Sequence, residues 1–114
     1  MEIEVNGKTY RLHFKRRHVY QANLLKDITR IQKELDEDTE RSLLQMHEFT
    51  TKLLLVGLQK FHADEFGCDN FSGDYSEQLE LAEDLLDDFL AESQINLVDF
   101  TNQLLEALIA RGIV

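Results

Sequence analysis

Apolar residues recur at three- or four-residue steps through most of this chain, and the longest such run lies between residues 42 and 62. Its apolar stripe covers much more of a helix circumference than the usual third. The stripe is formed by Leu43, Met46, Phe49, Leu53, Val56 and Phe61, and it is widened by Leu44, Leu54, Leu55 and Leu58. A helix with so little polar surface must be surrounded by other elements. We therefore expect helix 42–62 to be the central element of the fold.

The N-terminal residues have a different pattern, in which polar and apolar residues alternate on both sides of Asn6-Gly7. Asn-Gly between alternating runs predicts a β-hairpin, because a type I′ turn needs positive φ at both central residues. The apolar face of this hairpin, over residues 1–14, would carry Ile3, Val5, Tyr10, Leu12 and Phe14. An isolated hairpin is marginal in water. Its apolar face must therefore lie on the helices, or the hairpin must join strands of another copy.

Helical spacing predicts three further helices, over residues 18–35, 76–92 and 96–111. Between them, residues 63–75 have two glycines, several Asx and Ser residues and no periodicity, which indicates a loop. The chain is thus predicted to be a single α+β domain over residues 1–114, mainly α, in which a hairpin and three helices pack on the central helix, four helices in all. The end of that central helix, at Phe61, leads into the loop, where the core could reach the surface and meet a partner.

Three polar positions are predicted to mark helix ends. Asp74, three residues before Glu77, is placed like the first residue of a capping box for helix 76–92, and Ser76 is an alternative cap. Asn96 (or Ser93) is a suitable N-cap for the last helix, and Gly112 stands where a C-terminal glycine is favoured.

Length and composition narrow the class of protein. A chain of 114 residues suits one domain. The single cysteine, Cys68, has no intramolecular disulfide partner, which agrees with a reducing compartment. No apolar run approaches the roughly 18 residues that a membrane span needs, and the N-terminus lacks the pattern of a signal peptide. We expect a location in the cytoplasm and no membrane partner.

The net charge of −10 is unevenly distributed. Residues 1–33 hold eight Lys/Arg and three acids, a balance of +5, whereas residues 34–114 hold four Lys/Arg and nineteen acids, a balance of −15. So acidic a body disfavours general nucleic-acid binding. The basic N-terminal third is expected to dock on the acidic remainder of the chain itself, in preference to an anionic partner.

The sequence offers little that points to catalysis. The best metal-ligand candidates are His62, Asp64, Glu65 and Cys68, with Asp69 as a fifth, but they lack the spacing of a zinc finger, and no HExxH is present. An acidic neighbour would raise the pKa of the Cys68 thiol and so disfavour a nucleophile. No P-loop and no Gly-x-Ser-x-Gly is present. We expect neither an enzyme nor a cofactor, and rank a metal-dependent enzyme far below the other hypotheses.

Three stretches carry a family resemblance. They are IEVNGKTYRLHF, an Asn-Gly hairpin before the first helix; TTKLLLVGLQKFH, an apolar middle helix; and LAEDLLDDFLAESQINLVDFTNQLLEALIARGIV, two acidic, leucine-rich final helices. In these features the chain resembles the tail assembly chaperones of long-tailed phages and prophages of Gram-positive bacteria.

The resemblance implies a non-enzymatic protein of the host cytoplasm that is absent from the mature virion. Such chaperones coat the hydrophobic tape measure protein and recruit tail tube subunits, and a longer frameshifted form is often made. Both proteins are the implied partners, and copies could pair through the hairpin as a homo-oligomer.

The client-binding surface admits two interpretations. The last two helices either simply cover the central one, or leave an acid-rimmed apolar groove that receives a hydrophobic helix. The candidate residues for such a surface are Phe66, Phe71, Tyr75, Leu85, Phe89, Leu104 and Leu108. The alternative function is a small acidic regulatory or inhibitory binding protein of phage origin, which would present acids spaced like phosphates.

Overall fold

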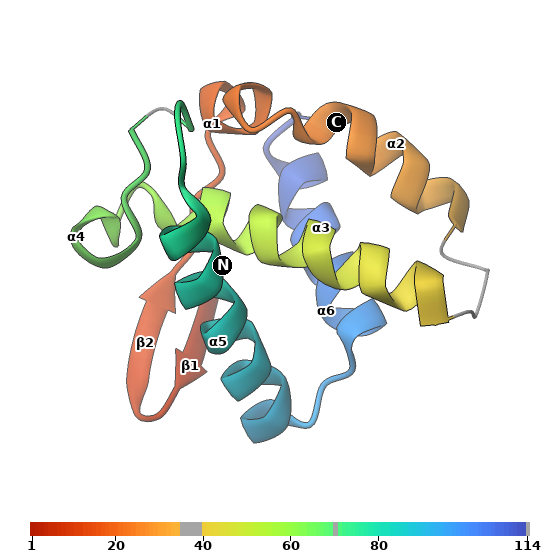
Figure 1. The fold of residues 1–114 in the computed structure, drawn as a ribbon. Coiled ribbons are helices and arrows are strands. Elements are labelled where there is room, and N and C mark those ends of the chain that lie inside the picture. The colour runs from red at the N-terminus through yellow and green to blue at the C-terminus, as the bar shows by residue number, and fades with distance from the viewer. Residues whose placement is uncertain (35–39, 70, 114) are drawn as a thin grey trace.

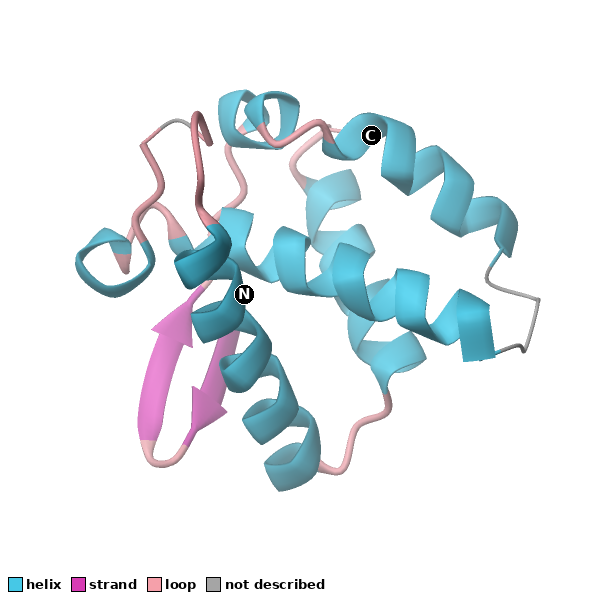
Figure 2. Cartoon of the chain, in the orientation of Figure 1, coloured by secondary structure: helices cyan, strands magenta, loops and turns pink. Residues whose placement is uncertain are grey.

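The computed structural model describes residues 1–34, 40–69 and 71–113, without the side chains of residues 31–34 and 40–42. Within these residues an N-terminal hairpin is followed by helices only (Figures 1 and 2). The elements are β1 Glu2–Val5, β2 Lys8–Arg11, α1 Arg16–Gln21, α2 Leu24–Glu34, α3 Glu40–Leu58, α4 Ala63–Phe66, α5 Ser76–Ser93 and α6 Leu97–Ala110. The predicted α+β class, mainly α, is confirmed.

The hairpin forms as predicted. Its strands are antiparallel, with Ile3 opposite Tyr10, and the turn residues Asn6 and Gly7 have φ of 52° and 79°. Ile3 and Val5 are buried, and β1 packs against α5 while β2 contacts α3. The apolar face of the hairpin therefore lies on the helices of its own chain.

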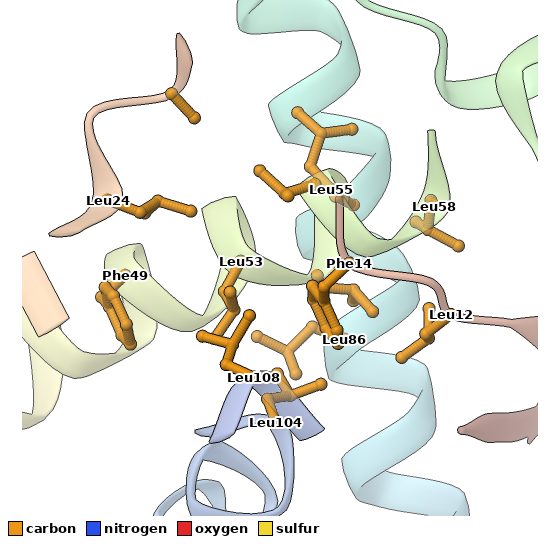
Figure 3. Close-up of a cluster of buried hydrophobic side chains, with 14 of the residues drawn as sticks. Leu12, Phe14, Leu24, Phe49, Leu53, Leu55, Leu58, Leu86, Leu104 and Leu108 are labelled. Atoms are coloured by element: carbon orange, nitrogen blue, oxygen red, sulfur yellow. The ribbon is translucent and has the colours of Figure 1, made fainter. Parts of the chain in front are cut away.

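α3 is the central helix, and it contacts β2 and all of the other helices (Figure 1). Leu53 to Leu58 form an unbroken buried run. Around it converge Leu86 from α5, Leu104 and Leu108 from α6, and Phe14 from the segment after β2 (Figure 3). Burying a side chain of this size contributes roughly 1.5–3 kcal/mol. The central packing role predicted for helix 42–62 is confirmed.

The C-terminal end of α3 differs from the prediction, since the helix ends at Leu58 and not at residue 62. The Gln59 side chain donates to the Leu55 carbonyl at 3.0 Å, and the Gln59 backbone N–H turns instead to Val56 at 3.4 Å. In a continuing helix the Gln59 backbone N–H would donate to the Leu55 carbonyl, but the Gln59 side chain occupies that acceptor. The last turn consequently tightens and the chain leaves the helix axis.

The prediction of one continuous helix over residues 18–35 is wrong. The chain forms α1 and α2, separated at Asn23, which adopts the left-handed conformation with φ of 57°. Asparagine tolerates this conformation because its short polar side chain can hydrogen-bond locally. The break leaves Leu24 buried but Tyr20 and Leu25 exposed, although at the spacing of the predicted helix all three belong to one apolar stripe that ends at Leu35. Leu35, at the end of that stripe, lies outside the described residues.

Of the positions predicted at helix ends, Asn96 and Gly112 have the expected roles, whereas the N-cap of α5 is Tyr75 and the capping box predicted at Asp74 does not form. The Ser76 backbone N–H donates to Asp74 Oδ1 at 3.0 Å at the start of α5. Asn96 is the N-cap of α6, accepting from the Asp99 N–H at 2.8 Å. Gly112 follows α6 with φ of 70°. Its carbonyl and that of Arg111 accept from the Arg16 guanidinium, so the basic N-terminal segment closes the end of α6.

Candidate functional site

Most of the residues predicted to meet a client lie inside the protein. Tyr75 is half-buried and contacts the Phe71 ring edge-on at 5.4 Å. The other six are at most 8% exposed: Phe66, Phe71, Leu85, Phe89, Leu104 and Leu108. The leucine-rich stripes of α5 and α6 are used to cover α3, and two aromatic side chains of the loop tuck into the same core. These six residues therefore belong to the core of the chain and do not line a groove between α5 and α6.

Apolar surface is found instead between α3 and α5. Leu44 is 60% exposed, and its neighbour Leu43 is also exposed. Leu44 borders a cavity of about 220 Å³ that we call the α3–α5 groove; it is lined by Leu44, His47, Glu48, Thr51, Leu79 and Glu83. The sequence pattern had placed Leu44 in the widened stripe of the central helix. Leu44 does belong to the apolar stripe of α3, but the elements that pack on α3 do not cover this residue.

The rim of the α3–α5 groove is acidic. Glu48 of α3 and Glu83 of α5 line it, and both are exposed. His47 bridges the two helices, with its Nε2 3.4 Å from Asp87 Oδ1. On the outer surface of α5, Glu80 and Asp84 are also exposed. The groove thus offers leucine contacts beside two exposed carboxylates, one from each helix.

A second surface surrounds Phe61, at the end of the central run. The Phe61 side chain is 42% exposed, as the pattern suggested for this end of the run. The Arg11 guanidinium lies 4.6 Å from its ring centroid and the Lys60 ammonium 5.2 Å, both within the range of cation–π attraction. His13 meets the ring edge-on at 6.2 Å.

Positive charge accumulates around this second surface. Burial lowers the pKa of His13, and the nearby charges of Arg111, Lys60 and Lys15 lower it further. In a chain of net charge −10, this is a cationic face with an exposed aromatic ring. Its charge is opposite in sign to that of the groove rim.

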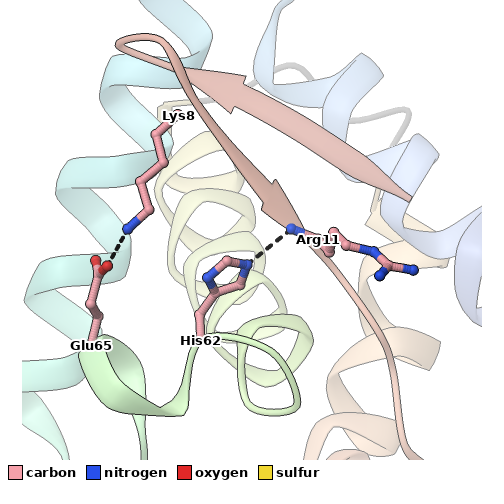
Figure 4. A network of polar contacts seen from close by, with 4 residues as sticks. All are labelled: Lys8, Arg11, His62 and Glu65. Atoms are coloured by element: carbon pink, nitrogen blue, oxygen red, sulfur yellow. Dashed lines mark hydrogen bonds and ion pairs between the residues drawn. The ribbon is translucent and has the colours of Figure 1, made fainter.

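Three of the residues weighed as metal ligands in the sequence, His62, Glu65 and Cys68, are engaged elsewhere. The Arg11 backbone N–H donates to His62 Nε2 at 3.0 Å, so that nitrogen has no hydrogen of its own (Figure 4). Glu65 forms an ion pair with Lys8. Cys68 is held by Gln59, whose Oε1 accepts from the Cys68 N–H at 2.8 Å, and burial raises the pKa of its thiol to about 11. The Lys8–Glu65 ion pair joins the basic N-terminal third to the acidic remainder, whereas Arg11 and Arg30 pair with acids of the N-terminal third itself.

Among the described residues, a different group brings three possible ligand atoms together. His47, Glu83 and Asp87 each offer one, and these atoms all lie within 4.8 Å of one another. In the sequence, His47-Glu48 begins like an HExxH motif but lacks its second histidine. The acids of α5 fall on the face of the helix opposite its leucines, and nothing in the pattern shows which of them meet α3.

No family model, curated protein or solved structure matches this chain. No helix among the described residues is long and apolar enough to cross a membrane.

Proposed function

We propose that this protein is a tail assembly chaperone that binds an apolar helical segment of a phage tape measure protein in the α3–α5 groove. It acts in the host cytoplasm, recruits tail tube subunits to the coated tape measure, and is absent from the mature virion. The observation that supports this proposal most is the exposure of Leu43 and Leu44 beside an acid-rimmed cavity. The three stretches that resemble the family add to it.

The groove suits a helix better than an extended strand. Its two walls are helices, α3 and α5, so a third helix can lie between them with apolar side chains at i, i+3 or i+4 reaching Leu44 and Leu79. A tape measure protein displays such apolar stripes before the tube surrounds it. Covering them removes an aggregation-prone surface from water. The acids Glu48 and Glu83 would favour clients with cationic residues beside the stripe.

The remaining partners find support in other parts of the surface. The Phe61 surface, with Arg11 and Lys60 at the ring, is separate from the lining of the groove and is available to the tail tube subunit. Each strand of the β1–β2 sheet has one partner within the described chain, so copies bound along one tape measure could pair at a hairpin edge.

The test is co-expression with the tape measure protein encoded beside this chain. The expected result is that the tape measure becomes soluble and co-purifies with the chaperone. Leu44→Asp should abolish both effects, since it places a charge among the groove contacts, and its exposure means that the domain still folds. Ile109→Asp is the matched control, because Ile109 is 54% exposed on α6, away from the groove lining.

Two outcomes would contradict the proposal. The first is failure of the wild-type chain to keep the tape measure soluble or to form a complex with it. The second is an equal loss with Leu44→Asp and Ile109→Asp, which would place the client elsewhere. Circular dichroism of both variants distinguishes lost binding from lost folding.

The second candidate function is an acidic regulatory or inhibitory binding protein. It is favoured by the row of exposed carboxylates along α5, namely Glu77, Glu80, Glu83, Asp84, Asp87 and Asp88. Such a protein would displace DNA from a basic host protein as a compact monomer. Neutralising Glu80 and Asp84 would then remove its activity, whereas the chaperone would keep its client through Leu44.

A further inference from the structure

Three side chains on two helices converge at the edge of the α3–α5 groove. His47 comes from α3, and Glu83 and Asp87 come from α5. Residues four apart lie on the same face of a helix, so both carboxylates face the same imidazole. Their three ligand atoms lie within 4.8 Å of one another, and His47 Nε2 is 3.4 Å from Asp87 Oδ1. We propose that His47, Glu83 and Asp87 form a binding site for a divalent transition-metal ion that links α3 to α5.

The spacing suits such an ion. A tetrahedral zinc ion with bonds of about 2.0–2.1 Å holds adjacent ligand atoms about 3.3–3.4 Å apart. The His47–Asp87 pair already has this separation. Glu83 is exposed, so its side chain can rotate to bring one oxygen to the same distance. The backbone of the site belongs to two packed helices and need not move.

The negative charge of the cluster favours the binding of a cation. Two carboxylates face one imidazole, which carries at most one positive charge, so the group keeps an excess of negative charge even when His47 is protonated. Asp88, also exposed on α5, adds to that excess. The His47–Asp87 contact therefore offsets only part of the negative charge of the two carboxylates, whereas a divalent ion would neutralise both.

The donor set selects the class of metal. One imidazole nitrogen with two carboxylate oxygens suits zinc, cobalt or nickel, whereas magnesium and calcium prefer sites made only of oxygen. Three protein ligands leave a further coordination position for water. His47 and Glu83 also line the α3–α5 groove, so the open position adjoins the proposed client site. The metal inference itself rests on the three ligands and not on the proposed function.

The experiment titrates the chelator-treated protein with zinc chloride, by calorimetry and by thermal unfolding. We expect one zinc ion per chain and a melting temperature that rises with zinc, since the ion binds only the folded arrangement of α3 and α5. Magnesium chloride at the same concentration should give neither effect. Glu83→Gln and Asp87→Asn should each weaken zinc binding at least about tenfold, because even outer-shell changes weaken metal binding by that factor.

Asp84→Asn is the matched control. It removes the same charge from the same exposed surface of α5 and lies outside the cluster, so its zinc affinity should stay within about twofold of the wild type. Absence of zinc binding at millimolar concentration would overturn the proposal. If all three substitutions weakened zinc binding equally, the ion would be held only by diffuse attraction to the negative charge of α5 and not by the three proposed ligands. Unchanged binding in Glu83→Gln and Asp87→Asn would place the ion elsewhere, and this outcome would overturn the proposal too.

Discussion

The hydroxyl groups of Thr50 and Thr101 lie 2.6 Å apart inside the core, where they connect α3 to α6. Both residues are fully buried. Thr101 Oγ1 also donates to the Leu97 carbonyl at 2.7 Å, which uses its only hydrogen. Thr50 must therefore be the donor to Thr101. The two residues form a directed chain of hydrogen bonds that runs from α3 to a carbonyl of α6.

This direction predicts unequal effects of two similar substitutions. Thr101→Val removes both bonds and leaves the buried Thr50 hydroxyl without its partner, which should lower the free energy of unfolding by about 2–3 kcal/mol. Thr50→Val leaves the Thr101–Leu97 bond in place and should cost about 1 kcal/mol. The double variant should be more stable than Thr101→Val alone, because no hydroxyl is then left unsatisfied. Urea unfolding measures all three, and equal costs for the two single variants would contradict the assigned direction.

The regular elements could be predicted because their signals are local. Asn6-Gly7 specifies a turn by its own backbone preference, and Asn96 satisfies N–H groups of the helix that it begins. The break at Asn23 could not be predicted in this way. The apolar spacing continues through it, whereas in the structure Leu24 is buried and α2 packs against α3 as a separate helix.

The candidate site was less predictable, because an amphipathic stripe does not show how much of its width is covered. The helical spacing of apolar residues places both Leu44 and Leu104 on inward faces, yet Leu44 is exposed and Leu104 is fully buried. The His47–Asp87 contact joins residues 40 positions apart, and no local pattern pairs them. Tertiary packing therefore had to be known before either the groove or the metal cluster could be recognised.

The contact between Gly57 and Phe14 gives a second prediction. A Cβ atom on Gly57 would lie 2.9 Å from Phe14 Cε1 and 3.4 Å from Leu12 Cβ, and the Phe14 ring is buried (Figure 3). The Gly57 carbonyl also accepts from the His13 N–H at 2.9 Å, which fixes this approach. Gly57→Ala should gain about 1 kcal/mol of helix propensity but lose about 1–3 kcal/mol to overpacking. We expect a net loss of stability of about 1 kcal/mol.

A double-mutant cycle with Phe14→Leu tests the cause of that loss. Leucine lacks the ring atoms that the new methyl group would meet, so Gly57→Ala should cost less in the Phe14→Leu background than in the wild type. The free energies come from urea unfolding. An identical cost in both backgrounds would show that the Phe14 ring is not the obstacle.

Gln59 supports the segment that follows α3 and gives a third prediction. Its buried amide donates to the Phe66 carbonyl at 2.8 Å and accepts from the Cys68 N–H at 2.8 Å. Gln59→Met keeps the length of the side chain but leaves both backbone groups without these partners. We expect a loss of about 2–4 kcal/mol by urea unfolding. Gln103→Met, at an exposed position of α6, is the control and should change stability by less than about 0.5 kcal/mol. Equal effects would contradict this bracing role for Gln59.

The Cys68 thiol gives a prediction about pH. Burial raises its pKa from 9.0 to about 11, because the thiolate would lose hydration, and the hydrogen bond from the Gln59 side chain offsets only part of this effect. The thiolate is the reactive form, so at pH 8 the folded protein should react with iodoacetamide roughly 100-fold more slowly than the same chain in urea.

The same rise in the pKa of the Cys68 thiol makes the stability of the fold depend on pH. The neutral thiol favours the folded state fully below pH 9, and this contribution is lost as the pH rises through about 11. Cys68→Ala should therefore lose less stability than the wild type between pH 9 and 11, as measured by urea unfolding at each pH. Alkylation at the rate of the unfolded chain, or identical pH profiles for the two proteins, would show that the Cys68 thiol is not held in its neutral form by the fold.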